Sequence, residues 1–269
     1  MQSLLLARPE DSDAIVGILQ AGFPNDLLPY TIFGCAGINA YIRDTIKNQN
    51  FGESSLYYVC IDKGEPSGFA ELRRTFTTLF LNHIYVLPAA RSIGMGRRLL
   101  TYGLIQTRSL NQDHLELDVF TDNRRAALWY ESLGLKTSYE QSWLKLSISS
   151  LAERRDRNWI SSGLSQADRL QDCYGFSQFS LQTQAATYGI GRLGESLFRS
   201  TDLSILKDSA ALGALQYLDP ARDLLCIGHG IALPDELTAG ARKLAESRRM
   251  AGSIETVLER LKNRAGADG

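Results

Sequence analysis

The sequence predicts an α/β protein in which mixed sheets carry helices on both faces, arranged as two related domains. Three observations predict this class. Apolar strand-like segments alternate with amphipathic helical segments over the first 148 residues. A glycine-bearing turn joins one of these strands directly to a helix, and the second half of the chain weakly repeats the first. With 269 residues, 44% of them hydrophobic, the chain is long enough to build two ordinary cores.

The elements of the first half follow from hydrophobic period and from turn residues. The Pro- and Gly-bearing stretch 23–36 reads as a loop, and Asp62–Gly68 reads as a turn between two strands. Around these breaks the pattern predicts strands at 3–7, 55–62, 67–76, 78–87, 114–120 and 137–148, and helices at 11–22, 37–49, 94–109 and 123–133.

The segment Val86–Leu100 carries the strongest functional signal, because it leads from a strand through glycines into a helix. The first amides of a helix have no intrahelical partner, the helix dipole adds partial positive charge, and glycine lets a bulky anion approach the backbone. We therefore expect a phosphorylated ligand on seven consecutive residues, namely Arg91, Ser92, Ile93, Gly94, Met95, Gly96 and Arg97.

Two common phosphate motifs do not fit this segment. A Walker loop, Gly-x-x-x-x-Gly-Lys-Ser/Thr, occurs nowhere in the chain, and a dinucleotide fingerprint would need glycine where Leu99 stands. The stretch Gly189–Gly194 has the dinucleotide spacing in letters, but no helical apolar face follows it. Both classes of nucleotide site are therefore set aside.

What does fit is Arg91-x-x-Gly94-x-Gly96 preceded by Val86-x-Pro88, which resembles the acetyl-CoA pyrophosphate motif of the GNAT superfamily. A second signature of that family follows, with the strand Leu115-x-Leu117-x-Val119 and then Asn123-x-x-Ala126-x-x-x-Tyr130-x-x-x-Gly134-Leu135. The opening stretch 4–13 also resembles the family's first strand and the acidic entry to its first helix. Ser92, Ile93 and Leu135 depart from the usual residues. The resemblance covers residues 3–149.

The resemblance implies a GNAT fold and an N-acetyltransferase that moves the acetyl group of acetyl-CoA directly to a primary amine in a ternary complex. It implies that backbone groups from Ile84 to Leu87, especially those of Val86, bind the thioester and pantetheine. Asn123, with Ala126 after it, caps a helix or binds the pantetheine arm. Tyr130 is expected to supply a proton or hydrogen bond to the departing CoA sulfur.

The residue that accepts the amine proton is left open at this point. His83 has a suitable intrinsic pKa and stands just before the phosphate turn. Glu71 on the preceding strand and Asp118 on the following one are acidic alternatives. Ordered water would also serve, so the site would not require a protein base.

The acceptor and the rival functions also remain open. The acceptor is expected to be an amine on a small molecule or a peptide, and the aromatic and apolar loop 23–36 suggests a partly hydrophobic pocket for it. A longer acyl-CoA would use the same site. A rival function of another class is a regulatory module that binds CoA or acyl-CoA without transferring the acyl group.

Charge and cysteine usage limit the partners. The formal charge of −1 is shared evenly: residues 1–150 hold 14 basic and 15 acidic residues, and the remainder holds 15 of each. Because neither half is basic, we expect no nucleic-acid partner, and we also expect no membrane span. We expect no metal, since the four widely spaced cysteines form no ligand pattern and read as small buried apolar residues. A cytoplasmic protein, either monomer or homodimer, is the expectation.

The second half is predicted to be a degenerate GNAT-like domain. Shifting the chain by 115 residues without gaps pairs ten identical residues between 100–146 and 215–261. In this alignment the positions that match Arg91, Gly94, Gly96, Asn123 and Tyr130 hold other residue types. The second half is therefore expected neither to hold the cofactor nor to carry out the reaction. The expected division is a catalytic acetyl-CoA domain over 1–149, a linker with the first elements of the next domain over 150–172, and the degenerate domain over 173–269.

Overall fold

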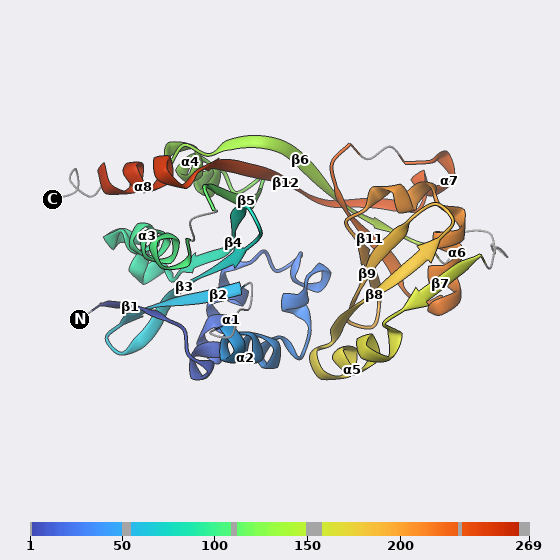
Figure 1. The fold of residues 1–269 in the computed structure, drawn as a ribbon, viewed down its shortest axis with the longest axis horizontal. Helices are drawn as coiled ribbons and strands as arrows, with labels where there is room; N and C mark the ends of the chain where they lie inside the picture. The colour runs from blue at the N-terminus through green and yellow to red at the C-terminus, as the bar shows by residue number, and fades with distance from the viewer. Residues whose placement is uncertain (1, 50–54, 109–111, 149–157, 231–232, 264–269) are drawn as a thin grey trace. The chain divides into compact units, whose positions relative to one another are not determined.

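The computed structural model describes residues 2–49, 55–108, 112–148, 158–230 and 233–263. The chain folds into two compact units, each built from separate stretches of sequence. Unit 1 comprises residues 1–24, 39–139 and 248–269, and unit 2 comprises residues 25–38 and 140–247. Figure 1 shows the helices and strands of both.

The elements of unit 1 are β1 (Ser3–Leu6), η1 (Pro9–Asp11), α1 (Ser12–Gly22), α2 (Ile38–Asn48), β2 (Ser55–Asp62), β3 (Glu65–Arg74), β4 (Thr78–Val86), η5 (Pro88–Ile93), α3 (Met95–Thr107), β5 (His114–Phe120), α4 (Arg124–Ser132) and α8 (Ile254–Asn263). Two long strands, β6 (Lys136–Leu146) and β12 (Ala241–Ser253), contribute to both units. The elements predicted from the sequence for residues 3–148 are all present, within three residues at each end.

The sheet of unit 1 has the strand order β1-β2-β3-β4-β5-β12-β6. The first four strands are antiparallel neighbours, and β4 and β5 are parallel. This is the mixed sheet that the sequence predicts. Parallel neighbours need a crossover connection, and α3 supplies it between β4 and β5.

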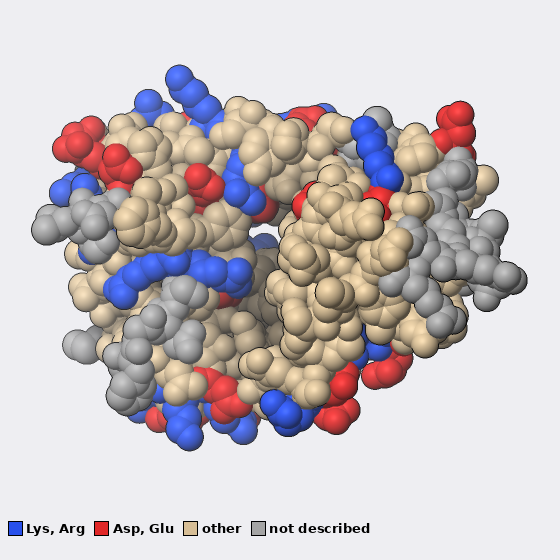
Figure 2. All heavy atoms as spheres, turned by 45° about the vertical axis from the view of Figure 1, so that its right-hand side comes forward, with Lys and Arg blue, Asp and Glu red and all other residues tan. Residues whose placement is uncertain are grey.

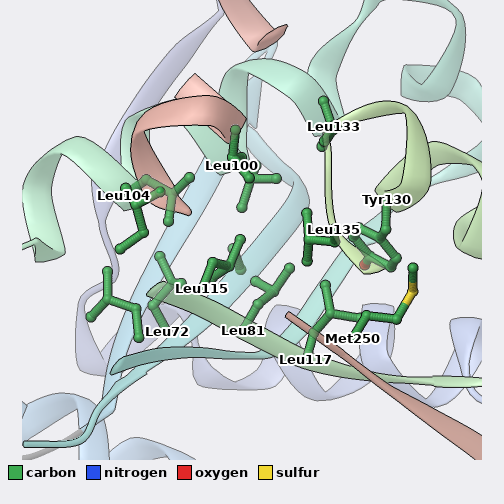
Figure 3. Packing of buried hydrophobic residues seen from close by; sticks show 14 of the residues in the cluster. Leu72, Leu81, Leu100, Leu104, Leu115, Leu117, Tyr130, Leu133, Leu135 and Met250 are labelled. Atoms are coloured by element: carbon green, nitrogen blue, oxygen red, sulfur yellow. The ribbon is translucent and has the colours of Figure 1, made fainter. Parts of the chain in front are cut away.

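Helices cover both faces of this sheet. Gly103 of α3 lies against the Leu72 side chain of β3, whereas Gly22 at the end of α1 lies against the Tyr85 ring of β4. Phe69 pairs with Tyr85, so their side chains lie on the same face of the sheet. Leu72 lies three residues after Phe69 in β3, so its side chain is on the opposite face. The helices α1 and α3 therefore cover different faces. The face of α3 holds the main core, with Leu81, Leu100, Leu104, Leu115, Leu117, Leu133, Leu135 and Met250 among its buried members (Figure 3).

Unit 2 repeats this strand plan. Its elements are η2 (Leu28–Tyr30), η3 (Ile32–Gly34), β7 (Trp159–Ser162), α5 (Leu164–Tyr174), β8 (Phe176–Thr183), β9 (Thr187–Leu193), β10 (Leu197–Ser200), η6 (Leu203–Lys207), α6 (Ser209–Leu218), β11 (Asp223–Gly228) and α7 (Asp235–Thr238). The strands β7 to β10 are antiparallel neighbours in sequence order, and β10 and β11 are parallel. The order of directions matches that of β1 to β5.

The strand beside the fifth strand of each sheet comes from the other half of the sequence. Unit 1 has β12 next to β5, and unit 2 has β6 next to β11, with Leu146 paired to Leu224. The contiguous division 1–149 and 173–269 therefore does not coincide with the compact units. Residues 248–269 lie in unit 1, although the sequence places them in the second domain.

The ungapped repeat alignment is wrong beyond its first element. A shift of 115 residues does place α3 on α6, but it places β5 on residues 229–235, whereas the fifth strand of unit 2 is β11. It also places α4 and β6 on β12 and α8, so it pairs a helix with a strand and a strand with a helix. The two units repeat each other in fold, with loops of different length, and most of the ten identities do not mark equivalent positions.

The loop 25–38 belongs to unit 2, where most of its apolar side chains are buried or partly buried. Tyr30 and Ile32 pack against a cluster formed by Leu193, Leu197, Leu225 and Ile227. The Tyr30 hydroxyl also accepts a hydrogen bond from Arg242 at 2.5 Å. Unit 2 passes from α5 directly to β8 without a second helix, and this loop packs on its sheet. This packing gives the apolar residues of the loop a structural role, and the acceptor pocket there stays a prediction.

The cysteines and surface charges complete the description. Cys35, Cys60 and Cys226 are buried thiols as predicted, whereas Cys173 is exposed, which contradicts the prediction for that residue. Figure 2 shows basic and acidic side chains interspersed on the visible face. No helix among the described residues is long and apolar enough to span a membrane.

Candidate functional site

The split between β4 and β5 is the central feature of the site. The two strands pair from Thr78–His114 to Leu81–Leu117 and no further, while β4 stays paired with β3 as far as Val86. A bulge marks the point of separation, because Glu71 pairs with His83 and Leu72 pairs with Leu81, which leaves Asn82 as the extra residue. A bulge bends its strand and re-aims the side chains around it.

The backbone of Ile84 and Val86 faces this split. The amide of Leu87 donates to the carbonyl of Ser67 in β3 at 2.9 Å, so residue 87 directs its backbone groups toward β3. Successive residues of a strand direct these groups to opposite sides. Ile84 and Val86 therefore present N–H and C=O groups on the side that β5 has left. Ile84 and Val86 are among the residues that the family resemblance implies for binding the thioester and pantetheine.

The phosphate turn of the sequence forms a helix entry. After η5, Gly94 adopts a left-handed conformation with φ 69° and stands at the N-cap of α3. Such a φ strains a residue with a side chain, so glycine is favoured here. A Cβ at Gly96 would lie 3.8 Å from the Val86 side chain, which is ordinary contact. The glycine at 96 therefore leaves open space rather than relieving a clash within the protein.

Of the residues predicted to hold phosphate, Arg91 places its side chain at the split, against the backbone of β4. Its Nε donates a hydrogen bond to the carbonyl oxygen of Val86 at 2.8 Å. Met95 is fully buried and offers only its backbone. For Ser92 and Ile93 the backbone belongs to η5, and their side chains lie outside the described part of the structure. Arg97 is partly exposed on the first turn of α3.

The second signature forms the entry of α4. The Asn123 side chain caps this helix and accepts a hydrogen bond from the amide of Ala126 at 3.2 Å, so the capping role is confirmed. Tyr130 on the same helix is only 7% exposed, and its ring lies beside Leu117, Leu135 and Met250 (Figure 3). Burial and then the neighbouring Tyr85 raise the pKa of Tyr130 above its usual range. The phenol is therefore a neutral hydrogen-bond donor at working pH.

His83 and Glu71 lie together on the α1 face, as cross-strand neighbours. His83 Nε2 is 3.9 Å from Glu71 Oε2. Burial lowers the pKa of His83 to about 4, although Glu71 opposes this effect. Burial alone would raise the pKa of Glu71, but the charge of Arg73, the electrostatic interaction with His83 and a hydrogen bond from Asn82 hold it below its ordinary value. At neutral pH the imidazole is uncharged and the carboxylate is ionised.

Two further side chains define this face. Asp118, the other acidic candidate, forms an ion pair with Arg249 of β12, with 2.6 Å between Arg249 Nε and Asp118 Oδ1. Tyr85 was not predicted. Its ring stacks on His83 with the ring centres 6.1 Å apart, and burial raises its pKa to about 12. The spacing of two residues along β4 would have placed Tyr85 beside His83 on one face.

The described residues of unit 2 show neither a split between the fourth and fifth strands nor a helix entry with free amides. Its fourth strand, β10, has four residues, and all of them pair with β11, so no backbone is left facing a split. The entry of α6 holds the carboxylate of Asp208, which accepts hydrogen bonds from the amides of Ala210 and Ala211, both at 3.0 Å. A side chain of the protein itself thus satisfies the amides that a phosphate would need.

Comparison with known proteins decides the family. Residues 10–135 match the model of the acetyltransferase (GNAT) family. Over both units the fold is similar to that of a tandem GNAT protein from the clavulanic acid biosynthesis pathway, with a TM-score of 0.61 and 12% identity, covering 94% of this chain and 98% of that one. Residues 10–135 therefore form a domain of the GNAT family, and the whole chain shares the fold of tandem GNAT proteins.

Other solved structures share this fold over nearly the whole length of the chain. A GCN5-related N-acetyltransferase from Sphaerobacter thermophilus has a TM-score of 0.59 and 13% identity, covering 94% of this chain and 96% of that one. A glucosamine N-acetyltransferase region of a fungal multi-domain β-N-acetylglucosaminidase has a TM-score of 0.61 and 12% identity, covering 94% of this chain and 38% of that one. No curated protein matches the sequence.

Proposed function

We propose that unit 1 binds acetyl-CoA and transfers its acetyl group to a primary amine. The observation that carries this proposal is that the split between β4 and β5 opens immediately before the helix entry at Gly94. Backbone groups of Ile84 and Val86 would hold the pantetheine arm in the split, and the first amides of α3 would hold the pyrophosphate. The match of residues 10–135 to the acetyltransferase (GNAT) family supports the same cosubstrate.

The proton balance sets what each side chain does. An alkylamine with a pKa near 10.4 is neutral in only about one molecule in 2,500 at pH 7, which costs about 4.6 kcal/mol. Transfer of a proton from that ammonium to His83, with a pKa of about 4, would cost roughly 9 kcal/mol. The neutral fraction of the amine therefore makes the attack.

His83 acts after the C–N bond begins to form. The nitrogen then becomes much more acidic than a free ammonium, so the weakly basic imidazole is able to take its proton, directly or through water. The C–S bond breaks, and the electron pair leaves with sulfur. A thiol has a pKa near 8.5, below that of a buried phenol, so Tyr130 stabilises the departing thiolate mainly through a hydrogen bond.

Unit 2 takes no cosubstrate in this proposal, since Asp208 satisfies the entry of α6 and β10 is paired along its length. Its contribution is to fold with unit 1, to which it is joined by β6 and β12. The amine would approach from the face that carries His83 and Tyr85. The class of acceptor, small molecule or peptide, is left for the assay to identify.

Two measurements test this function. Acetyl-CoA at 100 times its Kd would stabilise the chain by about 2.7 kcal/mol, so the melting temperature is expected to rise. Release of free thiol from acetyl-CoA across a panel of amines then separates transfer from binding alone. Stabilisation without thiol release would favour the regulatory module, and no stabilisation at all would contradict the proposal. Replacing acetyl-CoA by longer acyl-CoA in the same assay tests the chain length.

A further inference from the structure

Glu71 is a buried carboxylate with more contacts than an ion pair requires. It is 2% exposed. Its Oε1 accepts hydrogen bonds from Ser55 Oγ and Arg73 Nη2, both at 3.1 Å. Its Oε2 accepts one from Asn82 Nδ2 at 2.7 Å and faces His83 Nε2 at 3.9 Å. An anion held in this way has a low pKa and is a poor proton acceptor. Its chemistry is therefore electrostatic and positional.

The contact with Asn82 fixes the shape of β4. Asn82 is the bulged residue, and the pairing of β4 with β5 ends at the residue before it. The hydrogen bond from Asn82 to Glu71 spans two strands and anchors the extra residue against β3. The same carboxylate thus holds the bend from which the split opens.

The contact with His83 concerns the imidazole proton. A neutral imidazole carries one proton, on either of its two nitrogens, and nearby groups decide which. The negative charge of Glu71 lies closer to Nε2, which favours the proton there and leaves the lone pair on Nδ1. The Tyr85 ring stacked on the imidazole restricts rotation of the ring that would exchange the two nitrogens.

We infer that Glu71 is a positioning residue for the proposed transfer: it anchors the bulge at Asn82 and keeps the proton of His83 on Nε2, so that Nδ1 accepts the proton of the amine. This inference rests on the proposed function. Burying a carboxylate is costly, and an apolar side chain would fill the same space at lower cost. The ion pair with Arg73 stabilises the buried charge of Glu71. The contacts with Asn82 and His83 explain why a carboxylate stands at this position of β3.

The test compares Glu71→Gln with Glu65→Gln, a matched change at an exposed position of the same strand. The chain has three histidines, so long-range proton–nitrogen NMR spectra at neutral pH resolve each ring, and His83→Gln assigns the signal of interest. We expect the Nε2–H form of His83 in the wild type and in Glu65→Gln, and a mixture of both forms in Glu71→Gln. With an amine found in the thiol-release panel, kcat of Glu71→Gln is expected to fall roughly tenfold or more.

Further variants separate the two contacts. Asn82→Ser is expected to keep the His83 form and to weaken acetyl-CoA binding in calorimetry. Glu71→Asp, which keeps the charge but draws it back from His83, replaces Glu71→Gln if that variant does not fold. An unchanged His83 form in the Glu71 variant would overturn the inference even in an active enzyme. Absence of thiol release in the wild type would count against the proposed function instead, and the NMR result would still decide the role of Glu71.

Discussion

Arg249 and Asp118 form a two-point ion pair although 131 residues of sequence separate them. Arg249 Nε donates to Asp118 Oδ1 at 2.6 Å, and its Nη2 donates to Oδ2 at 3.0 Å. The guanidinium also contacts Glu116 at 3.2 Å and lies 4.8 Å from the centre of the Phe80 ring. These contacts join β12, from the end of the chain, to β4 and β5 beside the candidate site.

Unit 1 is therefore expected to depend on residues 248–263 for stability. Arg249→Met removes the charge from a partly exposed ion pair and should cost about 1–2 kcal/mol. Met250→Ala removes a fully buried side chain of the main core and should cost about 3 kcal/mol. Urea unfolding measures both. Lys262→Met, on the exposed side of α8, should change stability by less than about 0.5 kcal/mol.

This dependence could not be read from the sequence. Residues 241–253 contain few apolar side chains, and of these Met250 is buried. Such a polar stretch gives no strand signal, because its pairing comes from neighbours that are distant in sequence. The strands at 55–62 and 114–120 were placed correctly because the apolar residues within each segment mark it as a strand.

In the candidate site, too, the local features could be predicted from the sequence and the pairing between strands could not. The turn at Gly94 and the cap at Asn123 are local signals, and both were found. The bulge at Asn82 was not, since nothing in the letters of one strand shows which residue its neighbour leaves unpaired. Asp208, directly before an apolar helical run, is a cap signal that could have been recognised.

Gly94→Ala should weaken acetyl-CoA binding beyond its effect on stability. A side chain at φ 69° costs about 1–2 kcal/mol, and relief of that strain would move the first amides of α3. We expect Kd for acetyl-CoA, measured by calorimetry, to rise roughly tenfold or more. Gly64→Ala is the matched control, because Gly64 also has a positive φ and open space but lies in the β2–β3 turn. Equal Kd values for the two variants would contradict the assignment of the helix entry.

Asp208 makes a quantitative prediction for unit 2. Its carboxylate caps α6 and accepts hydrogen bonds from Thr183 at 2.6 Å and Tyr188 at 3.0 Å. Asp208→Ala should therefore destabilise the protein by about 2 kcal/mol. Calorimetry should give one acetyl-CoA per chain in the wild type, and still one in Asp208→Gly, because β10 offers no free backbone. A second bound molecule in either protein would refute this account of unit 2.

Tyr130→Phe should lower kcat by roughly 10- to 100-fold while the Kd for acetyl-CoA stays nearly constant. The ring keeps its packing among Leu117, Leu135 and Met250, and only the hydroxyl is lost. Tyr102→Phe removes a hydroxyl from a ring that packs against the same core, and it should leave kcat unchanged. If the Tyr130 variant transfers acetyl groups at the wild-type rate, another donor serves the departing sulfur.

Burial of His83 predicts how stability depends on pH. Its pKa falls from 6.5 in the unfolded chain to about 4 in the folded one, so between these values only the unfolded state binds the proton. The free energy of unfolding should therefore decrease as the pH falls from 6.5 to 4, by about 3 kcal/mol from this group alone. Glu71, whose pKa is lowered, adds a further loss below its unfolded value.

Urea titrations at a series of pH values test the His83 contribution. The curve for His83→Gln should fall less steeply between pH 6.5 and 4 than that of the wild type, whatever its stability at pH 8. His114→Gln removes a histidine whose side chain is 56% exposed and controls for the loss of one imidazole. Parallel curves for the wild type and His83→Gln would show that the imidazole is solvated in the folded state, and the proton balance proposed for the reaction would then have to be drawn with a stronger base.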